Sequence, residues 1–290
     1  MNHSSLASVG ATIEVLRRNG LYTKKSLGQH FLVDDNVVGR ILELAAIAPD
    51  DVVLEIGPGI GTLTVALCSQ AREVVAVETD PRLVPVLAET TSPCACPVRV
   101  VLADAVTVDP ALLAGDTGAP GLLVANLPYG VAATVVLRFF EILPAMRAAT
   151  VMVQAEVADR MTADPGCKAY GSYSVKLGLL AEAAGRFRVA PGSFLPPPRV
   201  DSAVVRLDRR EGVAAGDARL VRAASAADAA FAQRRKTLRN TLSSSLGAEP
   251  AVIEQALREA GFDPSARAES LEVAAFPVMG DALHEAGCLA

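Results

Sequence analysis

Short runs of apolar and β-branched residues alternate with longer, helix-like stretches through the middle of the chain. Each run is nearly continuous in hydrophobic residues, a pattern typical of strands buried on both faces of a parallel sheet. The runs are VVLEI (52–56), EVVAV (73–77), VRVVLA (98–103), GLLVA (121–125) and TVMVQ (150–154). Strands that alternate with helices predict an α/β fold, in which helices cover a mostly parallel, Rossmann-like sheet.

The pattern changes after Pro144. No obvious long helix separates the next apolar runs, so we expect them to be later strands of the same sheet, with the last strand antiparallel. These runs are SYSVKLGLLAE (172–182), GRFRV (185–189) and SAVVRL (202–207).

The rest of the chain predicts a separate helical part. The segment EGVAAGDA (211–218) has the composition of a linker. The sequence after it is rich in Ala and Leu, with breaks near Gly247, Gly261 and Pro277. We therefore expect a basic N-terminal segment with a helix (1–48), a Rossmann-like domain (49–210) and a small all-helical C-terminal domain (211–290).

Composition excludes several classes of protein. Hydrophobic residues make up 51% of the 290-residue chain, which favours a folded protein over a disordered one. The longest uncharged run (117–137) is interrupted by glycines and prolines, and the first twenty residues lack the apolar core of a signal peptide. Three scattered histidines and five cysteines without metal-binding spacing predict no metal site. We expect a cytoplasmic protein without membrane segments, and a monomer because no heptad pattern stands out.

Charge is unevenly distributed, although the formal net charge is −5. Between residues 50 and 160, thirteen acidic residues stand against six arginines and no lysine. The cations near the ends of the chain include Lys24, Lys25, Arg234, Arg235, Lys236 and Arg239. Such an arrangement suits a small-molecule pocket flanked by surfaces for a polyanion. The alternative is that each basic run is only the solvated face of a helix.

A glycine-rich turn follows the first predicted strand. The three glycines of EIGPGIGTLT (55–64) stand between strand and helix, where glycine permits positive φ and lets a ligand approach the backbone. Polar residues end the next three strands: Glu78, Asp104 and Asn126. Because the carboxyl ends of parallel strands line one crevice, we expect a small-molecule site there, with an acid placed for ribose hydroxyls. The alternatives are that the glycines form only a tight turn, that Glu78 is a surface acid and that Asp104 is a helix cap.

Seven motifs resemble those of class I S-adenosylmethionine-dependent methyltransferases, and more narrowly those of the KsgA (RsmA) family of ribosomal RNA adenine dimethyltransferases. They are KKSLGQHFLVD (24–34), EIGPGIGTLT (55–64), VETD (77–80), ADA (103–105), NLPY (126–129), FLPPPRVDSAVV (194–205) and FAQRRKTLRNTL (231–242). The resemblance implies S-adenosylmethionine as cofactor, bound by His30, Leu32, Gly57, Gly59, Glu78, Asp104, Ala105 and Asn126. The family usually has Asn where this chain has His30.

The NLPY motif supplies an amide, not a carboxylate, to the expected target amine. An exocyclic adenine amine is a poor nucleophile because its lone pair is delocalised, and two acceptors that hold its N–H bonds let the nitrogen become tetrahedral. We expect these acceptors to be the side-chain oxygen of Asn126 and the carbonyl of Leu127. Pro128 fixes the turn, and Tyr129 stacks on the base. The alternative is a strand-ending turn with a core tyrosine.

A second stacking face is expected from Phe194, which precedes three prolines that favour a stiff, extended loop. The alternative is a core side chain beneath that loop.

The resemblance implies dimethylation of N6 on two adjacent adenines near the 3′ end of 16S ribosomal RNA, within the immature 30S subunit. The cations of the two basic runs are then expected to hold this RNA. Three alternatives stay open: an Erm-type methyltransferase of 23S RNA, a ribosome-assembly factor whose RNA binding matters more than its catalysis, and an NAD(P) oxidoreductase, which the glycine spacing disfavours.

Overall fold

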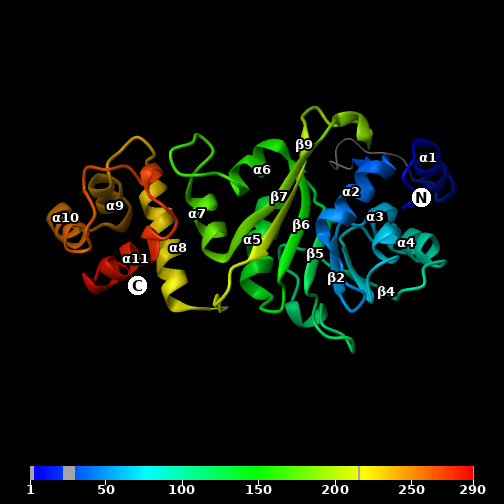
Figure 1. Cartoon of the computed structure of the whole chain (residues 1–290), viewed down its shortest axis with the longest axis horizontal. Coiled ribbons are helices and arrows are strands. Elements are labelled where there is room, and N and C mark those ends of the chain that lie inside the picture. The colour runs from blue at the N-terminus through cyan, green and yellow to red at the C-terminus, as the bar shows by residue number, and fades with distance from the viewer. Residues whose placement is uncertain (1–2, 22–29, 215, 290) are drawn as a thin grey trace. The chain divides into compact units, whose positions relative to one another are not determined.

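The computed structural model describes residues 3–21, 30–214 and 216–289, and Figure 1 traces its elements in chain order. The chain forms two compact units. The first consists of Met1–Ala158 and Ala183–Arg209, and the second of Asp159–Glu182 and Arg210–Ala290. The expected division at residues 210 and 211 therefore omits Asp159–Glu182, a segment of the second unit that precedes the linker in sequence.

A seven-stranded sheet, in the order β4-β3-β2-β5-β6-β9-β7, forms the centre of the first unit. Strands β4, β3, β2, β5 and β6 pair in parallel, whereas β9 pairs antiparallel with β6. The strands are β2 (Val52–Ile56), β3 (Glu73–Glu78), β4 (Val98–Leu102), β5 (Leu122–Asn126), β6 (Ala148–Gln154), β7 (Ala181–Val189) and β9 (Ser202–Arg209). The predicted α/β class and the antiparallel last strand are confirmed.

The strands of this sheet follow from the continuous apolar runs. All five residues of β2 and all six of β3 are buried, as expected for strands with both faces covered. One core cluster packs Val38 of α2 and Leu67 of α3 with Val124 of β5. The helices of this unit are α1 (Val9–Arg18), α2 (Asp35–Ala45), α3 (Thr62–Leu67), α4 (Leu83–Thr91) and α5 (Ala132–Ile142), and α6 (Ala155–Met161) crosses the boundary between the units.

A small two-stranded sheet ties the N-terminal segment to the loop before β9. Its strands, β1 (Phe31–Leu32) and β8 (Phe194–Leu195), pair antiparallel, with Leu32 opposite Phe194. Ser193 extends this contact, because its Oγ donates to Asp34 Oδ2 at 2.9 Å. Residues 30–34 are thereby held against the loop at residues 193–196.

The N-terminal helix packs onto the same unit. Val15 and Leu16 of α1 share a hydrophobic cluster with Phe31, Ile60 and Leu83. The N-terminal part of the chain that the structure describes therefore shares the core of the Rossmann-like domain, instead of forming the separate segment expected for residues 1–48.

The prediction of a strand at residues 172–182 is wrong for most of its length, because Ser172–Leu180 is a helix, α7. Val175, Leu177 and Leu179 alternate as in a strand, but Val175 and Leu179 are also four residues apart and so share a helix face. Both pack in one cluster with the alanines of α8 (Ala218–Phe231). Packing against α8 therefore overrides the two-residue periodicity.

The predicted all-helical C-terminal part is confirmed. Besides α8 it contains α9 (Leu238–Leu246), α10 (Pro250–Glu259) and α11 (Ala275–Glu285). Gly247 ends α9 at φ 66°, a conformation that favours glycine. Pro277 lies in the first turn of α11, where a missing N–H is tolerated, so the break falls before it. Within the described residues no helix is both long and apolar enough to cross a membrane.

Candidate active site

A cavity of about 560 Å³ lies at the carboxyl ends of β2, β3, β4 and β5. Its walls include every residue that was expected to bind the cofactor or to form the NLPY turn, but not Phe194, the expected second stacking face. These residues are His30, Leu32, Gly57, Gly59, Glu78, Asp104, Ala105, Asn126, Leu127, Pro128 and Tyr129. Segments that lie far apart in sequence therefore converge on one site, as expected for an open α/β sheet.

The glycine turn brings bare backbone to this cavity. Gly57 and Gly59 have φ values of 67° and 61°, which side chains rarely adopt. A Cβ on Gly57 would lie 3.4 Å from the ring of Pro128, and a Cβ on Gly59 would lie 3.3 Å from Phe31. Side chains at these two positions would crowd the wall of the cavity, so the turn leaves room for a ligand.

Glu78 holds a fixed carboxylate at the end of β3. Its side chain is 4% exposed, and its Oε1 accepts from the backbone N–H groups of Thr79 at 2.9 Å and Asp80 at 2.8 Å. Oε2 accepts from the Gly59 N–H at 3.4 Å. Burial raises the pKa of Glu78, and the backbone donors oppose that rise. A carboxylate held in this way can accept hydrogen bonds from a ligand diol.

Asp104 lies two residues beyond the end of β4 as an exposed residue that organises the following turn. Its Oδ1 accepts from the N–H of Val106 at 2.8 Å, and its carbonyl accepts from Thr107 and Val108. The alternative interpretation as a cap thus describes part of its role. Asp104 also lines the cavity, beside the buried Ala105, so the two roles are compatible.

The side-chain amide of Asn126 has a defined orientation. Its Nδ2 donates to the backbone carbonyl of His30 at 3.2 Å. Because that carbonyl can only accept, the amide nitrogen is committed to it and Oδ1 is the group left to accept from a ligand. Next to it, the Leu127 N–H donates to the Met152 carbonyl at 3.0 Å, which fixes the start of the turn on β6.

Tyr129 is held by two side chains from other segments. Its hydroxyl lies 2.7 Å from Oγ of Ser202, and its ring stacks on His30 with centroids 5.6 Å apart. Burial raises the pKa of Tyr129, and the hydrogen bond with Ser202 opposes that rise. Nδ1 of His30 lies 2.7 Å from the carbonyl oxygen of Pro196. His30 therefore contacts the site with its backbone and with its ring.

Phe194 is buried in this structure, and its expected stacking role stays a prediction. Phe194 is 3% exposed, pairs with Leu32 in the small sheet, and belongs to the central hydrophobic core. It lies outside the walls of the cavity. The alternative interpretation as a core side chain describes it, because β1 covers the ring that the proline loop was expected to project. Phe31, 7% exposed, is the phenylalanine that lines the cavity.

Sequence reasoning missed Glu55 and Thr62, which also line the cavity. Glu55 is 2% exposed, and burial raises its pKa to about 8, with a further rise from the negative charge of Glu78. Among the described residues, Glu55 Oε2 and Thr62 Oγ1 are buried atoms without a hydrogen-bond partner. Buried polar atoms of this kind call for a polar or cationic ligand group. Both residues lie in the EIGPGIGTLT motif, but only its glycines were assigned to the site.

The expected RNA-binding cations differ in their surroundings. Arg234 forms an ion pair with Glu269 at 3.3 Å, and Arg239 forms one with Glu254 at 3.0 Å. Arg235 and Lys236 are exposed and pair with no acid in the described part of the chain. Positions 234–236 lie on the turn between α8 and α9 and not, as in the alternative interpretation of this basic run, on a helix face. Lys24 and Lys25 lie outside the described residues.

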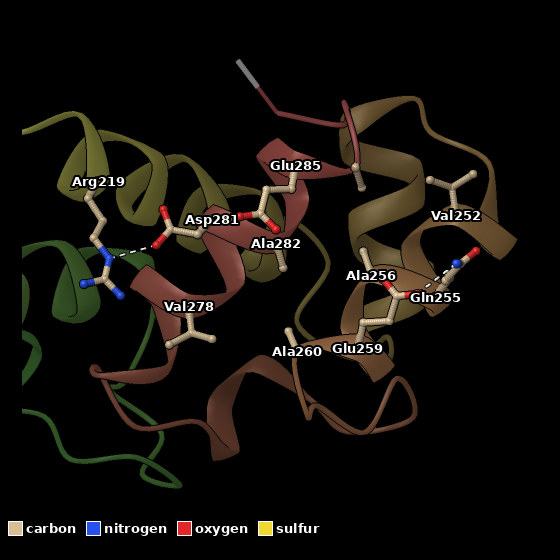
Figure 2. Close-up of a pocket in the computed structure, with 11 residues that line it drawn as sticks. Arg219, Val252, Gln255, Ala256, Glu259, Ala260, Val278, Asp281, Ala282 and Glu285 are labelled. Carbon is tan, nitrogen blue, oxygen red and sulfur yellow. Dashed lines mark hydrogen bonds and ion pairs between the residues drawn. The ribbon is translucent and has the colours of Figure 1, made fainter.

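A second cavity, of about 500 Å³, lies within the other unit and is lined by residues of α8, α10 and α11. Figure 2 shows Arg219 bonded to Asp281 on one side and Gln255 close to Glu259 on the other. Val252 and Val278 are also on its wall. Its lining has no serine, threonine, cysteine, lysine or histidine and no pair of acids with shifted pKa values, and no cluster of potential metal ligands occurs among the described residues. The chemistry therefore belongs to the first cavity.

Comparison with known proteins agrees with this geometry. The family model described as "Ribosomal RNA adenine dimethylase" matches residues 20–279. A Rhodococcus erythropolis protein named "Ribosomal RNA small subunit methyltransferase A" is 46% identical over 263 residues, which cover 89% of this chain and 87% of that protein. A Geobacillus thermodenitrificans protein of the same name is 42% identical and covers 97% of this chain and 98% of its own length.

Two solved structures are also similar. The 23S rRNA methyltransferase ErmE is 31% identical with a TM-score of 0.66, over 88% of this chain and 99% of that one. A dimethyladenosine transferase from Plasmodium falciparum superposes with a TM-score of 0.75 at 23% identity, over 89% of this chain and 98% of that one, which supports the fold. The family model spans both units and includes the cavity, the NLPY turn and the basic turn. The chain belongs to the ribosomal RNA adenine dimethylase family.

Proposed function

We propose that this protein transfers methyl groups from S-adenosylmethionine to N6 of two adjacent adenines near the 3′ end of 16S ribosomal RNA. The observation that carries the proposal is the orientation of Asn126, whose amide nitrogen is committed to the His30 carbonyl at 3.2 Å. This leaves a neutral acceptor oxygen at the end of β5, in a cavity that fits a nucleoside cofactor. The relatives named "Ribosomal RNA small subunit methyltransferase A" support the small-subunit substrate.

The residues of the cavity fit the parts of S-adenosylmethionine. Glu78 offers a fixed carboxylate to the ribose hydroxyls, and Asp104 and Ala105 are placed for the adenine ring. The open backbone at Gly57 and Gly59 suits the methionine part, and the partnerless oxygen of Glu55 suits its positive charge. When bound, this cofactor supplies an electrophilic methyl group on a sulfonium, together with a neutral leaving group.

The turn after β5 then has to orient the target amine. Asn126 Oδ1 and the carbonyl of Leu127 accept the two N–H bonds of adenine N6, which draws the lone pair out of conjugation and aims it at the methyl carbon. Because both acceptors are uncharged, they do not place a second carboxylate beside the amine. The nitrogen loses a proton after the transfer, so no strong base is needed before it.

Most of the rate enhancement comes from positioning. About 7–11 kcal/mol of the barrier is available because translational and rotational entropy is already lost on binding. A base within folded RNA has to leave its stack and enter the pocket, where Tyr129 offers an aromatic face worth about 1–3 kcal/mol. Phe31 and His30 supply the other rings beside the cavity, whereas Phe194 lies outside its walls.

RNA binding is assigned first to Arg235 and Lys236, whose charges no described acid neutralises. Arg234 and Arg239 are secondary candidates because Glu269 and Glu254 compete with phosphate for them. Lys24 and Lys25 remain candidates from the sequence alone. The substrate implies a cytoplasmic enzyme that acts on the immature 30S subunit, and we infer that it acts as a monomer.

The nearest alternative is methylation of 23S RNA, favoured by the 31% identity with ErmE. The identities of 41–46% with the small-subunit methyltransferases outweigh it. Unmethylated 30S particles and 23S RNA offered in parallel, with cofactor labelled on its methyl group, test the choice. We expect label in the 30S particles. Label in 23S RNA alone would reverse the assignment.

A second alternative, an assembly factor whose catalysis is secondary, shares the basic turn. Asn126→Ala removes the acceptor while leaving Arg235 and Lys236 unchanged. If methylation is the main role, this variant binds 30S particles but fails to restore a growth or assembly defect of cells that lack the protein. Full restoration would favour the binding role.

A further inference from the structure

Tyr129 is held in one plane by side chains outside its own turn. Its hydroxyl lies 2.7 Å from Oγ of Ser202, and the planes of the Tyr129 and His30 rings are inclined by only 27°. Ser202 is the first residue of β9, and His30 immediately precedes β1. The orientation of the ring that meets the target base is therefore set by two segments far from NLPY in sequence.

Ser202 is a rigid partner for the phenol. It is completely buried and lies opposite Gln154 in the antiparallel β6–β9 pairing. Its hydroxyl is therefore fixed relative to the sheet that also carries Asn126. Loss of the hydrogen bond of a partly buried phenol costs free energy. The ring therefore favours the position in which its oxygen reaches Ser202.

His30 covers one face of Tyr129. Nδ1 of His30 lies 2.7 Å from the carbonyl oxygen of Pro196, which can only accept, so Nδ1 carries the proton and the imidazole is anchored. With this ring stacked on one face of Tyr129, a base stacks on the opposite face. His30 and Ser202 together define both the plane and the usable side of the aromatic ring.

The two methyl transfers depend on this ring to different degrees. Adenine N6 offers two N–H bonds to the acceptors of Asn126 and Leu127, whereas N6-methyladenine offers one. With one hydrogen bond fewer, stacking on Tyr129 supplies a larger share of the positioning in the second transfer.

We propose that Ser202 and His30 are positioning residues that fix the plane of Tyr129 and thereby favour the second methyl transfer over release of the monomethylated base. This inference rests on the proposed function, since it concerns the same amine and the same turn. Neither residue is required to touch the reacting atoms.

The test is a time course of N6-methyladenosine and N6,N6-dimethyladenosine formed on unmethylated 30S particles, from which the ratio of the second to the first rate constant is obtained. Ser202→Ala and His30→Ala are each expected to lower this ratio about three- to tenfold, the effect of one typical hydrogen bond or weak contact. Affinity for S-adenosylhomocysteine, measured by calorimetry, is expected to stay unchanged in Ser202→Ala. A merely structural loss of active enzyme would lower both rate constants and leave their ratio intact.

A double-mutant cycle isolates the contact between Ser202 and Tyr129. Tyr129→Phe removes the hydroxyl from the other side and should lower the ratio as Ser202→Ala does, and the double variant should be no worse than the Phe variant. His30→Phe keeps an aromatic ring over Tyr129 and should stay closer to the wild-type ratio than His30→Ala. Effects that add in the double variant would contradict the contact between Ser202 and Tyr129. Equal losses in both His30 variants would contradict the contact between the rings of His30 and Tyr129.

Ser174→Ala is the matched control. Ser174 is also buried, and its Oγ donates to the Arg160 carbonyl at 2.8 Å, away from the pocket. The ratio of the second to the first rate constant in Ser174→Ala should equal that of the wild type. Wild-type ratios in both Ser202→Ala and His30→Ala would overturn the inference while the proposed function stands. Absence of dimethyladenosine with the wild-type protein would instead refute the proposed function.

Discussion

The side-chain nitrogen of Asn126 donates to the backbone carbonyl of His30 across 96 residues of sequence, at 3.2 Å. This bond determines which end of the amide faces the ligand, because a carbonyl can only accept. Asn126, at the end of β5, thereby presents its Oδ1 as an oriented acceptor. The N-terminal segment around His30 acts on the catalytic turn through its backbone, in addition to its ring.

Asn126→Asp tests this orientation. A carboxylate cannot donate to the His30 carbonyl and would be repelled by it, so the side chain should leave its position. We expect the rate of methyl transfer to fall roughly 10²–10³-fold, as when one oriented polar group is removed from an active site. Single-turnover measurements on 30S particles, at saturating cofactor, would show it. An Asp variant as fast as the wild type would mean that the amide orientation is irrelevant.

Glu55 should make the stability of the cofactor-free protein depend on pH. Burial raises its pKa to about 8 in the folded state, from an ordinary value of 4.5. The folded state therefore binds the proton more tightly, so its contribution to stability is complete below about pH 4.5 and is lost as pH rises to about 8.

Glu55→Gln, which keeps the shape without the charge, should abolish this loss. The free energy of unfolding at pH 8 is expected to rise by a few kcal/mol relative to wild type, with little change at pH 5. Urea unfolding at the two pH values measures both. Parallel pH dependence in the two proteins would show that Glu55 is not the group responsible.

Glu78→Gln should weaken cofactor binding. The amide would present an NH₂ group to backbone donors at Thr79, Asp80 or Gly59 that now donate to carboxylate oxygens. We expect affinity for S-adenosylhomocysteine to fall about 10- to 100-fold, as a charged hydrogen-bond acceptor contributes about 1.5–3 kcal/mol.

Glu73→Gln provides the control for this measurement. Glu73 is buried at the opposite end of the same strand and pairs with Arg99 at 3.2 Å. This change can cost stability but should leave affinity unaltered in calorimetry. Equal losses of affinity in the two variants would indicate a general effect on β3.

The cations on the turn between α8 and α9, together with Arg239 in α9, should divide into two functional pairs. Arg235→Gln with Lys236→Gln removes cations that no described acid neutralises. We expect the slope of log affinity against log salt concentration to flatten by about 0.7–0.9 for each phosphate that the protein no longer neutralises. Arg234→Gln with Arg239→Gln removes the same charge from cations that are already paired, so its effect should be smaller. Filter binding to 30S particles across a salt series compares the two. Equal slopes in both double variants would contradict the division.

The predictable parts of the fold and site are those that depend on local sequence. The run VVLEI forms β2 over the same five residues, because a strand covered on both faces needs a continuous apolar run. Glu78, Asp104 and Asn126 could be brought together from sequence because the ends of parallel strands share one edge.

The features that sequence did not predict depend on distant partners. Residues 172–180 form a helix because Val175 and Leu179 pack against α8. Phe194 is buried by pairing with Leu32, a contact between segments far apart in sequence. Arg234 is neutralised by Glu269, which lies 35 residues further along the chain. The sequence around each of these residues does not identify its distant partner.

The central claim is that the turn at Asn126 dimethylates adjacent adenines of small-subunit RNA. It is tested most directly by mass spectrometry of fragments of 16S RNA, after unmethylated 30S particles have been incubated with the protein and S-adenosylmethionine. The proposed function predicts two neighbouring N6,N6-dimethyladenosines near the 3′ end with the wild-type protein, and neither with Asn126→Ala. If wild-type protein that is folded and binds the cofactor leaves the adenines at those positions unmodified, the proposed function is contradicted.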